Sequence, residues 1–163
     1  MAFQDEKWVD LLPRVWKAWA PKGSDVRVPT LGYTKRVNCF ITLFWPRKNI
    51  ITNCFSRRRN IEFRKHLSNI VAYAKRHRLK KVILFIDDAS YHKTPQVEKF
   101  VRQHPVLSIK TLPGKDPNSN PVECLVNKRL ASAVCVNRCH EGLAALKLET
   151  KKFLRMYNSI YAT

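Results

Sequence analysis

The chain has 163 residues, a length that fits one domain with a single hydrophobic core. Hydrophobic residues make up 45% of it and glycine occurs only four times, which excludes a disordered chain. The 31 lysines and arginines outnumber 12 aspartates and glutamates and give a formal net charge of +19, so we expect a polyanionic partner: nucleic acid first, with an anionic membrane surface or ribosomal RNA as the alternative.

The first third of the chain is predicted to supply three strands. A strand near residue 4 must be short, because very little chain precedes Asp5. Residues 36–44 and 50–55 are rich in β-branched and aromatic side chains, and the segment WPRKN between them contains turn-forming residues. These two runs therefore predict a β-hairpin.

Helices and strands alternate over the rest of the chain. Asn60 is expected to cap a helix over 61–78, where apolar residues recur at helical spacing. A second helix opens at Thr94 and Pro95, an N-cap followed by a proline in the first turn, and ends near residue 103. The remaining elements are a buried strand at 81–86, a strand at 106–112, a loop over 112–121, a helix from about 121 and an amphipathic helix over 141–157. This order predicts an α/β fold, in which helices pack on a mixed sheet.

Three acidic residues follow from this order as a candidate site. In open α/β sheets, binding groups gather at the carboxyl ends of strands. Asp5 is expected at or near the end of the first strand, Asp87 directly follows the apolar run VILFI, and Glu123 begins a helix after the SNP turn. We therefore expect the three carboxyl groups to meet at one edge of the sheet.

Such a cluster of acids would repel itself unless a cation neutralised it. Mg²⁺ favours carboxylate oxygens together with water and substrate phosphate, and two ions about 3.5–4 Å apart serve phosphodiester chemistry. The basic exterior would hold the nucleic-acid backbone around this centre. Taken singly, two of the acids have a structural explanation: Asp87 as a cap or turn former, and Glu123 as a first-turn acid that favours the helix dipole.

Four segments in this order resemble the catalytic domain of DDE transposases of the IS630/Tc1-mariner superfamily: FQDE at 3–6, WAPKG at 19–23, IDDASYHK at 86–93 and LPGKDPNSNPVE at 112–123. Between the second and third acids lie 35 residues, within the mid-thirties spacing typical of that superfamily. The resemblance implies an RNase H-like fold, with a mixed five-stranded sheet flanked by helices, over 1–163 as a single catalytic domain. Members of the family usually carry an N-terminal helix-turn-helix region that binds DNA, and we expect this chain to lack it.

The resemblance assigns roles residue by residue. The catalytic triad, which would bind two Mg²⁺ or Mn²⁺ ions, comprises Asp5, Asp87 and Glu123. Three secondary candidates come from the same motifs: Asp88, where the family usually has asparagine, His92, and Asn120, which would position the final acid. For His92, a structural role as a hydrogen-bonded loop residue remains an equal alternative.

Basic runs and tryptophans are candidates for contact with DNA. The basic residues expected at phosphates are Arg57, Arg58, Arg59, Lys75, Arg76, Arg78, Lys80 and Lys81. The alternative is that they only solvate a surface. Trp8, Trp16 and Trp19 also lie near basic residues and could stack on bases, but core packing is the favoured interpretation.

Nothing in the sequence indicates secretion or a membrane span. No apolar run approaches the roughly 18 residues of a spanning helix, and the start, MAFQDEKW, lacks the basic-then-apolar order of a signal peptide. The five cysteines are odd in number and have no disulfide-framework spacing. We therefore expect no membrane partner and an intracellular setting, in the cytoplasm or nucleoid of a prokaryotic cell or the nucleus of a eukaryotic one.

Taken together, these features predict a metal-dependent DNA transposase catalytic domain. It would hydrolyse phosphodiester bonds at transposon ends and join the freed 3′-hydroxyl to target DNA, as a homodimer in the active complex. Two alternatives stay open: a catalytically inactive or domesticated relative that binds DNA without cutting it, and another RNase H-like nuclease, such as one that resolves junctions.

Overall fold

The computed structural model describes residues 1–113 and 120–161. Within this part, five strands form one sheet in the order β3-β2-β1-β4-β5. Their bounds are β1 Ala2–Asp10, β2 Arg36–Phe44, β3 Ile50–Phe55, β4 Val82–Ile86 and β5 Leu107–Thr111. The pairs β1–β2 and β2–β3 are antiparallel, whereas β1–β4 and β4–β5 are parallel. The predicted mixed five-stranded sheet is therefore confirmed.

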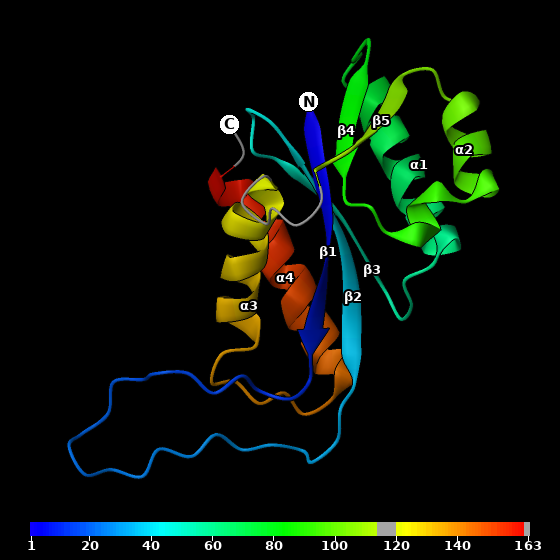
Figure 1. Ribbon diagram of the computed structural model, residues 1–163. Helices are drawn as coiled ribbons and strands as arrows, with labels where there is room; N and C mark the ends of the chain where they lie inside the picture. Colours follow the sequence, from blue (N-terminus) through cyan, green and yellow to red (C-terminus); the bar gives the residue numbers. More distant parts are fainter. Residues whose placement is uncertain (114–119, 162–163) are drawn as a thin grey trace.

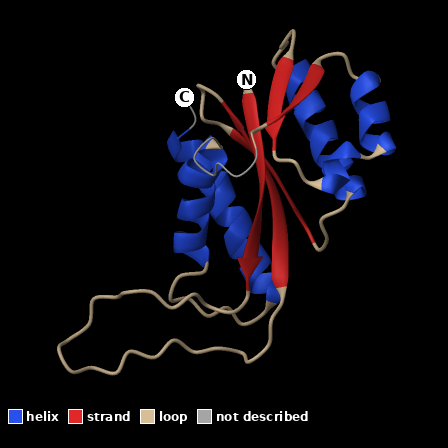
Figure 2. Ribbon diagram, viewed as in Figure 1, coloured by secondary structure: helices blue, strands red, loops and turns tan. Residues whose placement is uncertain are grey.

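Helices cover both faces of the sheet (Figures 1 and 2). On one face lie α1 (Asn60–Arg76) and α2 (Pro95–Arg102), and on the other α3 (Lys128–Val134) and α4 (Leu143–Tyr161). The described residues also contain two short turns: the 3₁₀ turn η1 (Ser90–Lys93) and the π-helical turn η3 (Glu123–Asn127), which leads into α3. No helix within the described residues combines the length and the apolar character that a bilayer crossing requires.

Each face has its own hydrophobic core, because β2 is apolar on both sides. Its successive residues alternate between the two cores, as the period of a strand dictates. Cys39, Ile41 and Leu43 pack with side chains of α3 and α4, whereas Phe40 and Phe44 pack with side chains of α1. A strand buried on both faces fixes the two helical layers to the centre of the molecule.

The first strand is longer than predicted, and Asp5 lies in its middle rather than at its end. Pairing with β2 continues from Ala2 to Asp10, whereas pairing with β4 stops at Phe3. Beyond Phe3, the side of β1 that faces β4 has no strand beside it. Asp5 therefore lies next to the end of β4, although not at the end of its own strand.

Two helix starts depart from the prediction in detail. Asn60 is the first residue of α1 rather than its cap, and its side chain donates to Gln96 Oε1 at 3.5 Å. Thr94 precedes α2 and Pro95 opens it, as predicted, but without a side-chain capping bond. Of the predicted loop over 112–121, residues 114–119 lie outside the described residues.

The tryptophans are exposed, so the prediction that they pack in the core is wrong. Trp16 and Trp19 are 72% and 105% exposed and lie in the long connection between β1 and β2, which extends away from the sheet (Figure 1). Asn137 binds the near end of this connection: it accepts from the Trp16 N–H at 2.9 Å and donates to the Trp16 carbonyl at 3.0 Å. Trp8 is 41% exposed on β1.

Candidate active site

Two of the three predicted acids share one hydrogen-bond donor. Asn127 Nδ2 donates to Asp5 Oδ2 at 2.7 Å and to Glu123 Oε2 at 2.9 Å. One amide nitrogen carries two N–H groups, so both bonds can form together. Glu123 and Asn127 stand at the two ends of η3, and this π-helical turn presents both side chains to β1. The local helix geometry therefore brings Glu123 to Asp5.

The surroundings of Asp5 disfavour its charged form. Burial is the largest cause, and the negative charges of Glu6, Glu123 and Asp87 add to it, so that the pKa of Asp5 rises to about 7. A hydrogen bond from the Glu6 backbone N–H to Asp5 Oδ1, at 2.9 Å, acts in the opposite direction. Lys7 Nζ lies 3.7 Å from Glu123 Oε1 and partly offsets the charge of that acid. A bound cation would stabilise the ionised forms of acids arranged in this way.

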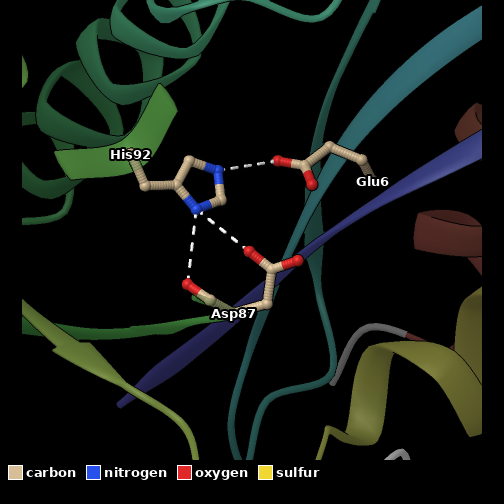
Figure 3. A group of neighbouring side chains, drawn as sticks. All are labelled: Glu6, Asp87 and His92. Carbon is tan, nitrogen blue, oxygen red and sulfur yellow. Dashed lines mark hydrogen bonds and ion pairs between the residues drawn. The ribbon is translucent and has the colours of Figure 1, made fainter. Parts of the chain in front are cut away.

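Asp87, directly after β4, contacts His92 instead (Figure 3). Its Oδ1 lies 3.0 Å from His92 Nδ1 and accepts a hydrogen bond from the Ala89 N–H at 3.1 Å. The other ring nitrogen of His92, Nε2, lies 3.1 Å from Glu6 Oε1. Figure 3 shows the imidazole between the two carboxylates, with Glu6 coming from β1 and His92 from η1.

His92 is protonated at neutral pH. Burial by itself would lower its pKa, but the hydrogen bonds and charges of Asp87 and Glu6 outweigh burial and raise the pKa to about 9. In return, the hydrogen bond from His92 lowers the pKa of Asp87, against the effect of the partial burial of that carboxyl group. The imidazolium therefore donates from both nitrogens and joins the two acids.

This link predicts a pH-dependent contribution of His92 to stability. Because its pKa is about 9 in the folded chain and 6.5 for the free group, the stabilisation is complete below pH 6.5 and is lost as the pH rises through 9. We expect the wild type to have a higher free energy of unfolding than His92→Gln. This difference should be about 2 to 3 kcal/mol larger at pH 6 than at pH 10. Denaturant titrations of both proteins at the two pH values measure this difference, and an equal difference at both would contradict it.

The three predicted acids lie close together but not around a single point. Within the described residues, Glu6, Asp87 and His92 are the one group of three potential ligands whose atoms all lie within 4.8 Å of one another. Asp5 and Glu123 meet through Asn127, and Asp87 is near enough to raise the pKa of Asp5. The edge of the sheet at the end of β4 therefore holds all three acids in two linked subgroups.

This site suits a divalent cation. Its donors are carboxylate oxygens, the ligands that Mg²⁺ and Mn²⁺ prefer. In addition, the side-chain oxygen Oδ1 of Asn127 is buried without a hydrogen-bond partner among the described residues, although its amide group touches two of the acids. A buried polar oxygen without a partner is costly unless something else satisfies it.

The secondary candidates Asp88 and Asn120 have different surroundings. Asp88 forms an ion pair with Lys93, and both side chains are more than half exposed. Asn120 is buried: its Nδ2 donates to the Gln4 carbonyl at 3.0 Å, and its Oδ1 accepts from the Val122 N–H at 3.1 Å. Asn120 therefore caps the helical segment that carries Glu123 and attaches it to β1 beside Asp5.

Sequence reasoning missed two residues of the site, Glu6 and Asn127. Neighbours on a strand point to opposite faces, so the adjacent acids Asp5 and Glu6 of a central strand had to face different layers. The signal for Asn127 was its position four residues after Glu123, where a helical turn brings side chains together.

The first basic run, residues 57–59, borders the acids. The guanidinium of Arg58 lies 4.4 Å from the ring centre of Trp8, and that of Arg36 lies 4.9 Å from the same ring. The charge of Arg58 also helps to lower the pKa of Asp87. Arg59 is engaged elsewhere, because it binds Glu62 through two hydrogen bonds of 3.1 and 2.7 Å. All three arginines of this run are exposed, and Arg58 is the one whose charge acts on Asp87.

The second basic run, residues 75–81, lies at the other end of α1. Lys75, Arg78 and Lys80 line a surface hollow together with His104, and Arg76 and Lys81 are exposed next to it. Because α1 is 17 residues long, the two runs are separated by about 25 Å along the helix. They present two positively charged regions to a polyanion.

The mixed sheet covered by helices on both faces is the fold of an RNase H-like domain. The family model of the DDE superfamily endonucleases matches residues 1–146, and the chain belongs to this family. The resemblance to DDE transposases inferred from the sequence is thereby confirmed. No curated protein matches the chain.

Several solved structures share the fold. A pre-cleavage Mos1 transpososome has a TM-score of 0.74 and 12% identity, covering 94% of this chain and 48% of that chain. The Mos1 transposase paired-end complex with the left transposon end has a TM-score of 0.72 and 14% identity, covering 94% and 47%. The catalytic domain of Mos1 mariner transposase has a TM-score of 0.66 and 12% identity, covering 94% and 69%. The chain thus spans about half the length of the transposase chains in the complexes.

Proposed function

We propose that this chain is the catalytic domain of a metal-dependent DNA transposase. It cleaves phosphodiester bonds at transposon ends and joins the freed 3′-hydroxyl to target DNA. The main observation behind this proposal is that Asp5 and Glu123 both accept a hydrogen bond from Asn127, beside Asp87. These acids belong to a DDE-family chain of net charge +19. An acidic centre on a strongly basic molecule suits a metal-assisted reaction on a polyanion.

The proposed metal ligands are Asp5, Asp87 and Glu123, for two Mg²⁺ or Mn²⁺ ions. Solved relatives support this choice, since they include a Mos1 paired-end complex with Mn and a Mos1 catalytic domain with raltegravir and Mg. Bound divalent ions would activate the attacking oxygen and stabilise the leaving one. The chain itself contributes the partly buried Asp5, which must give up its proton, and Asn127, whose Nδ2 donates to both Asp5 and Glu123.

The proposed partners are transposon ends and target DNA, bound by a homodimer in a compartment that contains DNA. The Mos1 structures include a paired-end complex with transposon-end DNA and a strand transfer complex, which supports these partners. In this chain, the basic residues 57–59 beside the acids are proposed to bind the phosphates next to the cleaved bond.

Nicking of supercoiled plasmid by the purified chain tests the proposal. We expect relaxed and linear products in the presence of Mn²⁺ or Mg²⁺ and none with EDTA, and we expect products of strand transfer when pre-cleaved ends are supplied. DNA binding without any metal-dependent cleavage would instead identify an inactive relative. Cleavage restricted to branched DNA, with no strand transfer, would identify a junction-resolving nuclease.

The second basic run gives a separate prediction at Arg78. This residue has φ of 52° and occupies the position after a helix end that usually holds glycine. The Leu79 N–H bonds to the Ala74 carbonyl at 2.8 Å and the Arg78 N–H to the Lys75 carbonyl at 3.1 Å, which is the Schellman pattern. We therefore expect Arg78→Gly to stabilise the fold by about 1 kcal/mol, because glycine adopts this conformation without steric cost.

The same substitution is expected to weaken DNA binding. If Arg78 contacts a phosphate, its loss should reduce the slope of log affinity against log salt by about one unit. Titration of a labelled duplex at several salt concentrations, with melting of the free protein, measures both effects. Lys152→Gln is the matched control, since it removes one charge on α4 beside Glu149. Equal salt slopes for the two variants would show that the second run only solvates the surface.

A further inference from the structure

Behind Asp87 lies a buried pair that the proposed chemistry does not itself use. The side chains of His92 and Glu6 are 1% and 2% exposed, whereas that of Asp87 is 53% exposed. Contacts therefore run from a solvent-accessible carboxylate, through a buried imidazole, to a buried carboxylate (Figure 3). The contact between Glu6 and Asp87 passes through the His92 ring.

Both buried members are held on several sides. Glu6 Oε1 accepts a hydrogen bond from Gln4 Nε2 at 2.7 Å in addition to its contact with His92. The ring of His92 lies 4.2 Å from the ring of Phe63 and 4.3 Å from that of Tyr91, measured between centroids. The imidazole therefore has little freedom to turn away from either carboxylate.

Packing alone does not explain these residues. Placing charged groups in the interior carries a desolvation cost that apolar side chains of similar volume avoid. The arrangement instead resembles the outer partners of ligands in metal sites, which fix the orientation of a ligand through hydrogen bonds. What the pair orients is Asp87, the half-exposed end of the series.

We propose that Glu6 is a positioning residue, which acts through His92 to hold Asp87 Oδ1 in one orientation toward the metal site. This inference rests on the proposed function, because Asp87 must be a metal ligand. Asp87 follows the last residue of β4 and its side chain is half exposed, so without His92 it would sample other rotamers. A metal ion would then bind only those molecules in which Asp87 has the rotamer that faces the site, which lowers the affinity for the metal.

The test measures binding of Mn²⁺ alone by calorimetry, without DNA, in variants of Glu6. Glu6→Leu removes the acceptor of the His92 N–H, and we expect the dissociation constant for Mn²⁺ to rise about 10- to 100-fold. Glu6→Gln keeps an oxygen that can accept from both Gln4 and His92, so we expect it to restore affinity to within about threefold of the wild type. In nicking assays, Glu6→Leu should raise the Mn²⁺ concentration for half-maximal rate and leave the rate at saturating Mn²⁺ nearly unchanged.

A buried histidine elsewhere in the same layer gives the matched control. His66 is fully buried and lies 2.7 Å from both Thr42 Oγ1 and Asn53 Oδ1, away from the acids. His66→Leu should lower the melting temperature in the same way as Glu6→Leu and leave Mn²⁺ affinity unchanged. Equal losses of Mn²⁺ affinity in both would show a general loss of structure and overturn the inference.

Asp87→Asn separates the failure of this inference from that of the proposed function. If Asp87→Asn weakens Mn²⁺ binding but Glu6→Leu does not, the metal site stands and the positioning role is wrong. If Asp87→Asn leaves Mn²⁺ binding unchanged, Asp87 is not a ligand and both are wrong. Failure of Glu6→Gln to restore affinity would also overturn the positioning role, since it would show that charge rather than orientation matters.

Discussion

Asp87→Asn is expected to abolish metal-dependent cleavage of DNA, with a loss of about three orders of magnitude or more. The carboxamide has the shape of the carboxylate but no negative charge, and only one of its two polar atoms can bind a cation. Its oxygen can still accept from the Ala89 N–H and from His92, the partners of Asp87 Oδ1. The fold should therefore be retained, and the loss should be confined to the chemistry.

DNA binding should be unchanged or stronger in this variant, because a negative charge is removed from the surface that faces the phosphates. Nicking of supercoiled plasmid and binding of a labelled duplex, on the same protein sample, separate the two effects. Unchanged nicking would remove Asp87 from the active site and with it the transposase assignment.

Asp88→Asn supplies the control at the neighbouring residue. It makes the same chemical change one position later, where the carboxylate pairs with Lys93 and both side chains are more than half exposed. Exposed ion pairs contribute little, so we expect nearly wild-type cleavage. The two adjacent aspartates would thus differ sharply in effect. Equal loss in both variants would mean that general charge at this edge, rather than a particular ligand, governs the reaction.

The sequence predicted the fold well where its signals are local. The observed bounds of β2 and β3 are those expected from the β-branched runs 36–44 and 50–55, and Pro95 opens α2 as expected. A strand that is apolar on both faces must be covered on both, and this leads directly to helices on two sides. Each of these inferences depends on residues close together in the chain.

The site was harder to predict because its geometry depends on distant segments. Asp5 is next to Asp87 only because β4 stops pairing with β1 at Phe3, which the residues around Asp5 do not reveal. Trp8 was expected in the core, but it lies on β1 beside Arg36 of β2 and Arg58 of the loop before α1. An aromatic ring stacked on guanidinium groups can remain exposed at low cost. The identity of a residue does not disclose such neighbours.

Binding of Mn²⁺ to the free chain is expected to release a proton from Asp5, in a pH-dependent amount. The pKa of this carboxyl group is about 7, raised chiefly by burial and then by the charges of Glu6, Glu123 and Asp87. A bound cation requires the ionised form. We expect about 0.9 protons released per chain at pH 6 and about 0.1 at pH 8, with affinity rising about fivefold from pH 6 to 7 and about twofold from pH 7 to 8. Calorimetry in two buffers of different ionisation enthalpy measures the released protons.

The same shift has a consequence for stability without metal. Because the pKa of Asp5 is higher in the folded chain than the ordinary 3.8, the unfolded chain loses this proton first, and stability falls as the pH rises from about 4 through 7. Ionised Asp5 therefore destabilises the folded chain above pH 7, and Asp5→Asn removes this effect. The substitution also removes one of two hydrogen-bond acceptors, since Asp5 Oδ1 and Oδ2 bind different donors. We therefore expect Asp5→Asn to be more stable than the wild type by about 1 kcal/mol at pH 8 with EDTA.

Addition of Mn²⁺ should reverse that order. The wild type gains stability in proportion to the logarithm of metal concentration over its dissociation constant, whereas Asp5→Asn lacks a charged ligand and should gain little. Melting at pH 8 measures this reversal. Asp5→Asn should have the higher melting temperature with EDTA, and the wild type should have the higher one with millimolar Mn²⁺. A wild type that is already the more stable protein in EDTA would contradict the strained state of Asp5. Equal gains in stability for the two proteins in Mn²⁺ would show that the ion binds elsewhere. A metal ion offsets the destabilising effect of a residue only where the ion contacts that residue.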